Sequence, residues 1–238
     1  MQGTVWGSLM CTSSVDKLSK LFYNKEDTFY KYRGKIPVPP LGMVDDILSI
    51  QKPENAKQAN IIINKFIELK KLTLSEKKCS RIKIGKNVPT EEMKVHDYNM
   101  KESNKEKYIG DIIASNGKID DTINQRQAKG FGIIAEILSI LDDIPLGKYK
   151  VEIGLLLREA MLINGLLYNS EAWHNVSKKN IVKLMKVDEA LLRGILKAHS
   201  KTPLEFLYLE TGSVPIDWVI KSRRINYLQN ILRRDKMS

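Results

Sequence analysis

The chain has 238 residues, 42% hydrophobic and 28% charged, and 39 lysines and arginines against 28 acids give a net charge of +11. This is a globular composition, long enough for one or two domains, and the basic excess indicates an anionic partner, nucleic acid before anionic membrane. Two cysteines and three histidines exclude a disulfide framework and a four-ligand zinc site.

The amino-terminal segment does not have the pattern of a targeting sequence. Residues 1–14 lack a basic start and a long apolar run. No stretch approaches the ~18 apolar residues of a membrane span, and the most apolar region carries Glu152, Arg158 and Glu159. We therefore expect no membrane partner and, with so few cysteines, an intracellular location in the nucleus or cytoplasm.

The first half of the chain is predicted to mix helices with short strands. Prolines exclude a helix around residues 37–40, apolar residues recur at helical spacing over 57–72, and Asn116-Gly117 indicates a turn. The predicted elements are a helix at 12–21, a hairpin at 41–50, a helix at 57–72 and a segment at 73–85 whose end is extended. They are followed by a loop at 86–106, which contains one short strand at 93–95, and by a strand at 107–113.

The second half is predicted to be helical. Helices are expected at 119–140, 149–167, 181–198 and 215–234. Thr202 and Glu205 form a capping box with Pro203 at the first helical position, which predicts a short helix ending near Gly212. The fold class is therefore α+β, with a mixed part at 1–117 and an all-helical part at 118–238. Trp173 and Trp218 are expected to pack in the core.

Three Asp-Asp pairs are candidate carboxylate sites. Asp120-Asp121 lies where a helix should begin and favours its dipole, and Asp142-Asp143 lies at a helix end, where a solvated turn is sufficient. Each of these two pairs therefore has an ordinary structural role.

Asp45 and Asp46 differ because they interrupt an apolar segment, residues 41–50, that should be at least half buried. Adjacent carboxylates there are costly unless a cation compensates them. At a hairpin tip both side chains can converge on one edge and hold Mg²⁺, which prefers oxygen ligands. The same spacing also fits a turn whose acids simply face water, so both interpretations stay open.

The order of several segments resembles the reverse transcriptases of non-LTR, LINE-like retrotransposons. Those enzymes carry a Gln-Gly segment, an aromatic-x-Asp-Asp hairpin, a lysine-bearing turn after a helix, and a Tyr-Leu-Gly hairpin. The matching segments are Gln2-Gly3, Leu41-Gly42-Met43-Val44-Asp45-Asp46, Leu72-Thr73-Leu74-Ser75-Glu76-Lys77-Lys78 and Lys107-Tyr108-Ile109-Gly110.

Later segments extend this resemblance along essentially the whole chain. Leu167-Tyr168-Asn169-Ser170-Glu171-Ala172-Trp173 is similar to the Leu-Tyr-Gly-Ser-Glu-Thr-Trp stretch beyond the family's thumb. The segments near residues 202 and 223 are similar as well. The resemblance implies a partial palm at 1–117, followed by a helical thumb and carboxy-terminal region at 118–238.

The resemblance also implies an activity and its residues. In the family, RNA-directed DNA polymerisation is a nucleotidyl transfer that needs two Mg²⁺ ions held by aspartates from two palm strands. The implied roles are catalysis and metal binding for Asp45 and Asp46, leaving-group neutralisation for Lys78, or less strongly Lys77, a nucleotide and template pocket at Gln2 and Gly3, and a primer grip at Tyr108, Ile109 and Gly110.

Two departures from the family pattern affect this expectation. Met43 stands where the family usually has Tyr or Phe. The strand with the first metal-binding aspartate should precede Gln2, so that strand and the fingers are expected to be missing. We therefore expect a chain that binds Mg²⁺ weakly or not at all, does not polymerise DNA alone, and needs an upstream polymerase fragment.

Two basic clusters are candidate contacts to the backbone of an RNA template or RNA–DNA duplex. The segment from residue 70 to residue 86 contains seven lysines and arginines but only one acid, Glu76. In the last predicted helix, positions 223 and 234 lie on the same face. For any single lysine a solvated surface is an equal explanation. The candidates are Lys70, Lys71, Lys77, Arg81, Lys83, Arg223, Arg224 and Arg234.

Two other functions stay open. One is a non-catalytic, basic nucleic-acid-binding protein derived from such an element. The other is an unrelated helical interaction module, which predicts no antiparallel hairpin with Asp45 at its tip and no second hairpin at Tyr108.

Overall fold

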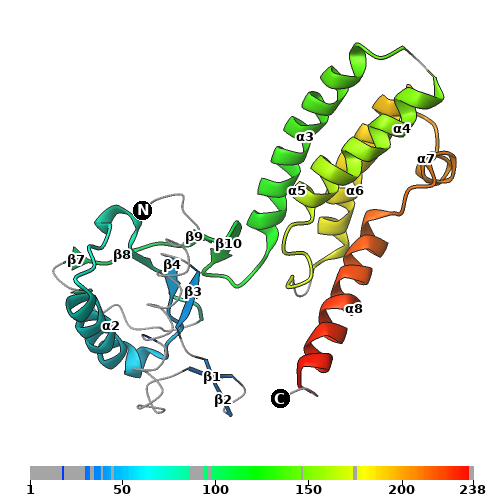
Figure 1. Cartoon of the computed structure of the whole chain (residues 1–238). Coiled ribbons are helices and arrows are strands. Elements are labelled where there is room, and N and C mark those ends of the chain that lie inside the picture. Colours follow the sequence, from blue (N-terminus) through cyan, green and yellow to red (C-terminus); the bar gives the residue numbers. More distant parts are fainter. Residues whose placement is uncertain are drawn as a thin grey trace. The chain divides into compact units, whose positions relative to one another are not determined.

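The computed structural model describes residues 18, 30–32, 35–38, 40–43, 46–85, 94–95, 98–145, 147–173 and 176–235 (Figure 1). Contacts divide the chain into two compact units, Met1–Tyr108 and Ile109–Ser238. The fold class is α+β, as predicted. Of the predicted helix at 12–21, only Leu18 lies within the described residues, and it is helical and buried.

In its described residues, the first unit contains short paired strands and one long helix. Among these strands, three pairs are antiparallel and one is parallel. The antiparallel pairs are β1 (Tyr30–Tyr32) with β2 (Ile36–Val38), β3 (Leu41–Met43) with β4 (Asp46–Leu48), and β6 (Lys94–Val95) with β7 (Tyr98–Asn99), and the parallel pair is β5 (Ser80–Arg81) with β8 (Lys101–Glu102).

The long helix of this unit, α2 (Ala56–Lys70), supplies its core. Ala59, Ile62 and Phe66 recur at helical spacing and are buried together with Leu18. The helix ends where Lys71 adopts a left-handed conformation with φ 51°. The predicted helix at 57–72 is therefore confirmed to within two residues at each end.

Two strand predictions for this unit were wrong in detail. The extended end of 73–85 is limited to β5. The short strand expected at 93–95 is confirmed as β6, but the described part of the expected loop at 86–106 also contains β7, β8 and the start of β9 (Lys105–Tyr108). These strands are short and mostly polar, so apolar alternation could not reveal them.

The predicted strand at 107–113 is two strands joined by a turn. β9 pairs with β10 (Asp111–Ala114), and the division between the two units falls in the turn between them. Gly117, with φ 66°, then closes a turn by donating its N–H to the carbonyl of Ala114 at 2.9 Å. The predicted turn at Asn116-Gly117 is therefore confirmed.

The second unit is a helical bundle in which α3, the α4–α5 run and α6 lie side by side (Figure 1). A π-helical segment (Arg158–Ile163) makes α4 and α5 one helical run, which matches the predicted helix at 149–167. The helices are α3 (Asp120–Asp142), α4 (Lys148–Leu157), α5 (Asn164–Leu166), α6 (Lys178–Leu196), α7 (Leu204–Thr211) and α8 (Ile216–Asp235).

One continuous hydrophobic core joins these helices. Ile137, Leu162, Leu184, Leu191 and Ile220 are each at most 2% exposed within it. Their helical spacing explains why the sequence placed these helices correctly. Among the helices that the structure describes, none combines the length and the hydropathy needed to cross a membrane.

The contact division falls at Tyr108/Ile109, nine residues before the boundary predicted after residue 117. The cause is β10, which packs on α3. The hydroxyl of Thr122 accepts the Ile112 N–H at 2.8 Å and donates to the Ile112 carbonyl at 3.3 Å. This strand is thereby tied to the helical unit.

The predicted capping box was wrong by one residue. α7 begins at Leu204, so Pro203 occupies the N-cap, and no side chain caps the helix there. Gly212 ends the helix in a left-handed conformation with φ 62°, as expected of a glycine at that place.

Candidate functional site

The β3–β4 hairpin places Asp46 at an exposed strand start. Its register pairs Met43 with Asp46 and Leu41 with Leu48, so only two residues connect the strands. The Asp46 side chain is exposed to solvent. Asp45, like Gln2 and Gly3, lies outside the described residues. The predicted antiparallel hairpin is therefore present, with one of its two carboxylates described.

Tyr108 of β9 lies against this hairpin within the first unit. Its hydroxyl donates to the Leu41 carbonyl at 3.4 Å. Burial, and then the negative charge of Asp46, raise the pKa of the Tyr108 phenol. The structure thus brings Tyr108 against the β3–β4 hairpin at Leu41, which lies 67 residues away in the sequence.

The described carboxylates do not by themselves form a metal centre. No three His, Cys, Asp or Glu side chains within the described ranges gather as a metal would require. Mg²⁺ in phosphoryl-transfer enzymes is commonly held by one or two carboxylates together with waters and substrate phosphates. The exposed Asp46 carboxylate fits such an ion only if further ligands complete the shell.

The lysine-bearing turn lies after α2, as predicted. Lys77 and Lys78 are exposed on a 3-10 turn at Glu76–Lys78, which the Ser75 carbonyl closes by accepting from the Lys78 N–H at 2.9 Å. Next to it, burial raises the pKa of the Cys79 thiol. A thiol held in its neutral form is a poor nucleophile.

Part of the predicted basic surface is paired with an acid. Lys83 Nζ lies 2.8 Å and Arg81 Nη2 3.5 Å from the same oxygen of Glu102 on β8. The hydrogen bond from Lys83 is the main cause that lowers the pKa of the Glu102 carboxyl. The sequence missed this acid because β8 lies beyond the basic run and reaches it only through pairing with β5.

The turn after β9 has a backbone shape that glycine favours. Gly110 has φ 84° and Ile109 has φ 46°, so both lie in the left-handed region. A two-residue hairpin turn needs this conformation, yet a β-branched residue rarely adopts it. Ile109 is thus held in a strained conformation at the predicted primer grip.

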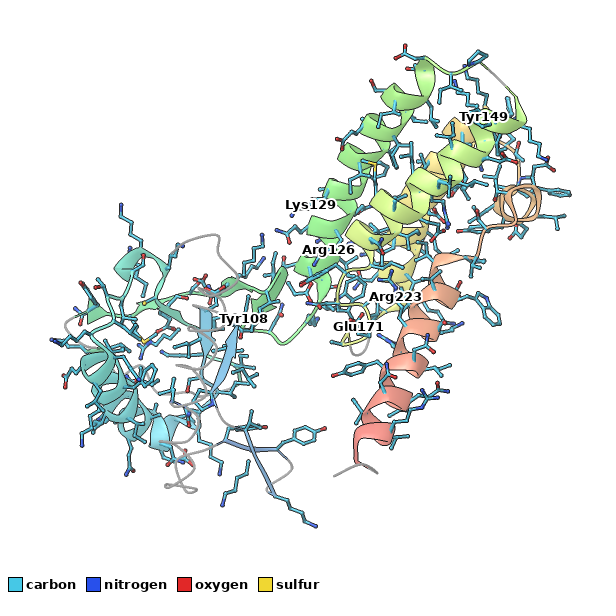
Figure 2. The ribbon with its side chains drawn as sticks, viewed as in Figure 1. Tyr108, Arg126, Lys129, Tyr149, Glu171 and Arg223 are labelled. Carbon is cyan, nitrogen blue, oxygen red and sulfur yellow. The ribbon has the colours of Figure 1, made fainter. Side chains whose placement is uncertain are left out.

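Side chains of the helical unit bind this turn, among them Arg126 on α3, which Figure 2 labels. Arg126 of α3 donates through Nη2 to the Gly110 carbonyl and to Asp111 Oδ1, each at 3.0 Å. Asn169 Nδ2 and Trp173 Nε1 both lie 3.4 Å from Asp111 Oδ2. Sequence reasoning missed this cluster, although an arginine on the buried face of a predicted helix was an available signal.

Arg223 and Arg224 of α8 donate to backbone carbonyls within the helical unit. Arg223 Nη1 lies 2.7 Å from the Leu167 carbonyl, and Arg224 donates to the Trp173 carbonyl. The side chain of Arg234 lies outside the described residues. These contacts occupy guanidinium donors that a phosphate would otherwise use, so the predicted phosphate-binding face of α8 has a structural role at both described arginines.

The two tryptophans in this region differ. Trp173 is 4% exposed, as expected of a core residue. The prediction for Trp218 was wrong, since its side chain is 63% exposed, with Lys221 Nζ 5.1 Å from the ring centroid. A cation over an aromatic ring stabilises such an exposed position.

A second charged cluster lies in the core of the bundle. Arg158, at the start of the π-helical segment, donates to both Asp188 oxygens at 2.6 and 2.8 Å and also contacts Glu159. The Tyr208 hydroxyl donates to Asp188 at 3.1 Å. Burial lowers the pKa of Arg158, but the hydrogen bonds and charge of Asp188 outweigh it and raise this pKa overall. The Arg158 guanidinium therefore stays charged.

No model of a known protein family matches this chain, and neither a curated protein nor a solved structure matches it. The function is therefore argued from the residues themselves and from the geometry that holds them.

Proposed function

We propose that the chain is part of the palm and thumb of an RNA-directed DNA polymerase from a LINE-like retrotransposon. In this proposal, Asp45 and Asp46 form one half of a two-metal nucleotidyl-transfer site. The observation that carries it is the β3–β4 hairpin, which presents Asp46 to solvent directly after a two-residue connection, with Tyr108 lying against it.

The residues of the hairpin would bind and position rather than react themselves. The Asp46 carboxylate, with Asp45, would hold Mg²⁺, which when bound activates the primer hydroxyl and stabilises the leaving pyrophosphate. Lys78 is an exposed ammonium on a tight turn and would neutralise negative charge on the leaving group. The Tyr108 phenol stays protonated because its pKa is raised, so it remains available as a neutral donor.

The distribution of charge supports a nucleic-acid substrate. The net charge of +11 favours a phosphate backbone, and the side chains of Lys77 and Lys78 are exposed to solvent. Lys71 ends α2 and is also exposed. These lysines, rather than Arg81 and Lys83 beside Glu102, are the first candidates for phosphate contacts.

A metal-binding test needs no catalysis. Mn²⁺, a paramagnetic substitute for Mg²⁺, should broaden the amide resonances of Asp46 and Ile47 in the whole chain. The double variant Asp45→Asn/Asp46→Asn should lose this broadening. Asp142→Asn/Asp143→Asn is the matched control, because it removes an exposed Asp-Asp pair at the end of α3 and should leave the broadening unchanged. Broadening that persists in the first variant would contradict the proposal.

A primer-extension test addresses the activity itself. The chain would be assayed on an RNA template with a DNA primer and Mg²⁺, alone and together with a separate polymerase fragment that carries a metal-binding palm aspartate. Product that disappears with Asp46→Asn supports a polymerase. Heteroduplex binding without product in either arm would instead favour the non-catalytic nucleic-acid-binding protein.

A further inference from the structure

We propose that residues 109–111 are held in one conformation by a clamp made of Arg126, Asn169 and Trp173, and that Arg223 and Arg224 are positioning residues of this clamp rather than phosphate contacts. We call residues 109–111 the tip. The inference rests on the proposed function only in naming the tip as the place where the primer end would bind.

The tip needs support from its surroundings. Ile109 is β-branched and has φ 46°, a conformation that persists only where neighbouring groups fix it. The Ile109 carbonyl accepts from Asn169 Nδ2 at 3.3 Å, and the Gly110 carbonyl accepts from Arg126 at 3.0 Å. Both carbonyls of the strained turn are therefore bound by side chains that are distant in sequence.

Asp111 is the centre of the clamp. Its carboxylate accepts from Arg126, Asn169 and Trp173, which come from α3 and from the turn at residues 167–173. The Arg126 side chain is 8% exposed and that of Asp111 is 24% exposed, so the pair is largely shielded from water. A shielded charge-assisted hydrogen bond is stronger than an exposed one.

The packing around Gly110 leaves the tip little space to move. A Cβ at this position would lie 3.2 Å from the Tyr168 ring and 3.4 Å from Arg126 Nη2. The Arg126 guanidinium also lies 5.2 Å from the centroid of the same ring. Glycine suits this position for its φ, and a side chain here would also crowd the Tyr168 ring.

The turn at residues 167–173 is fixed in its place by α8. Arg223 donates to the Leu167 carbonyl at 2.7 Å and to Asn164 Oδ1 at 3.3 Å, and Arg224 donates to the Trp173 carbonyl. Figure 2 shows Arg126 on α3 and Arg223 on α8 at the same end of the helical unit as Glu171 of this turn. Cations at a helix carboxyl end stabilise its unpaired carbonyls.

These contacts form a connected path from α8 to the tip. Arg223 and Arg224 hold the turn, and the turn presents Asn169 and Trp173 to Ile109 and Asp111. A tip fixed before binding loses less conformational freedom when a primer end docks. The arginines of α8 would then affect binding through the order of the tip, with no phosphate contact of their own.

The test compares exchange at the tip with the salt dependence of binding. In Arg223→Gln, amide exchange at Gly110 and Asp111 in the free chain should accelerate about tenfold, which corresponds to one lost hydrogen bond. Exchange at the Leu184 and Leu191 amides in the core should not change. Arg233→Gln is the control, because it removes an exposed arginine of the same helix and should leave the tip unaffected.

The salt dependence separates positioning from phosphate contact. Binding to an RNA–DNA duplex should keep its salt slope in Arg223→Gln, whereas Lys78→Gln should lower the slope by about one. A lowered slope in Arg223→Gln with unchanged exchange at the tip would overturn the inference. A chain that binds no duplex would refute the proposed function, but exchange at the tip would still test the clamp.

A second variant guards against a loss of folding in Arg223→Gln. Trp173→Phe removes the indole N–H donor and keeps a smaller aromatic ring in the core, so it should accelerate exchange at Asp111 while the helical content of the chain stays the same. In Asp111→Asn, the Trp173 indole N–H resonance should shift from its position in the parent chain. Unchanged exchange in Trp173→Phe would also overturn the inference.

Discussion

The two units of this molecule are stabilised in different ways. The helical unit has one continuous core and buries charged side chains, such as Arg158 and Asp188, with partners far away in sequence. The first unit pairs its described strands only two at a time, and its core cluster contains one face of α2 with Leu18. The candidate carboxylate, that of Asp46, lies in the first unit. Its position there is set by the register of the hairpin backbone rather than by buried side chains.

This difference predicts where substitutions will be costly. A buried charge without its partner is strongly destabilising, whereas an exposed pair contributes little. The buried pair of Arg158 with Asp188 in the helical unit is therefore the most sensitive place to test. The partly exposed pair of Lys83 with Glu102 in the first unit should be more tolerant of change.

The largest effect is expected from breaking the buried ion pair. Arg158→Met leaves the Asp188 carboxylate, which is fully buried, without its main partner. The helical unit should lose about 3–5 kcal/mol of unfolding free energy, measured by urea denaturation followed by circular dichroism.

An exposed pair on the same helical run is the control. Lys148 and Glu152 lie 3.7 Å apart with side chains 91% and 55% exposed. Lys148→Met should therefore change the unfolding free energy little. If the two variants lost similar amounts, the distinction drawn between the buried and exposed pairs would be wrong.

A smaller effect is expected from two glycines of α3 that differ only in their surroundings. A Cβ at Gly130 would lie 2.7 Å from Val187 Cγ1 and 3.1 Å from Leu166, whereas none would touch anything within 4 Å at Gly132. Gly130→Ala should destabilise the unit by about 1–2 kcal/mol through overpacking. Gly132→Ala should stabilise it by about 0.5–1 kcal/mol through helix propensity.

Thermal unfolding of both variants in parallel would show whether Gly130→Ala lowers the stability of the helical unit and Gly132→Ala raises it. The opposite shifts are the informative result, because both substitutions add the same methyl group to the same helix. A destabilised Gly132→Ala would show that the exposed face of α3 is constrained by something other than the packing described above.

The sequence predicted the helices well because their signal is local. Apolar residues at helical spacing placed α2, α3, α6 and α8 within a few residues of their observed bounds. The β3–β4 hairpin was also predicted, because an apolar segment interrupted by two acids fits few other structures. The place of Asp46 near the tip could be predicted together with this hairpin.

The side-chain partners could not be predicted in the same way. Arg126 and Asp111 are 15 residues apart, and Arg158 and Asp188 are 30 apart. Periodicity tells which face of a helix is buried but not which residue of another element meets it. For the same reason Arg223 and Arg224 resembled a phosphate-binding face, although their partners are carbonyls of residues 167 and 173.

The smallest expected effect concerns pH and compares one tyrosine from each unit. Burial, and then the charge of Asp188, raise the pKa of Tyr208 in the helical unit. A raised pKa means that the folded state favours the protonated phenol, so this stabilisation is complete below the ordinary value of about 10 and declines as the pH rises above it. Tyr208→Phe should remove this pH-dependent part and cost about 1 kcal/mol at neutral pH.

Tyr108 in the first unit supplies the comparison, because burial and Asp46 raise its pKa in the same direction. Its acceptor, the Leu41 carbonyl, is neutral and 3.4 Å away, whereas Tyr208 donates to a carboxylate at 3.1 Å. Urea denaturation between about pH 8 and about pH 11 should therefore show a larger difference between parent and Tyr208→Phe than between parent and Tyr108→Phe. Equal differences would mean that the exposed hairpin holds its tyrosine as firmly as the buried ion pair does.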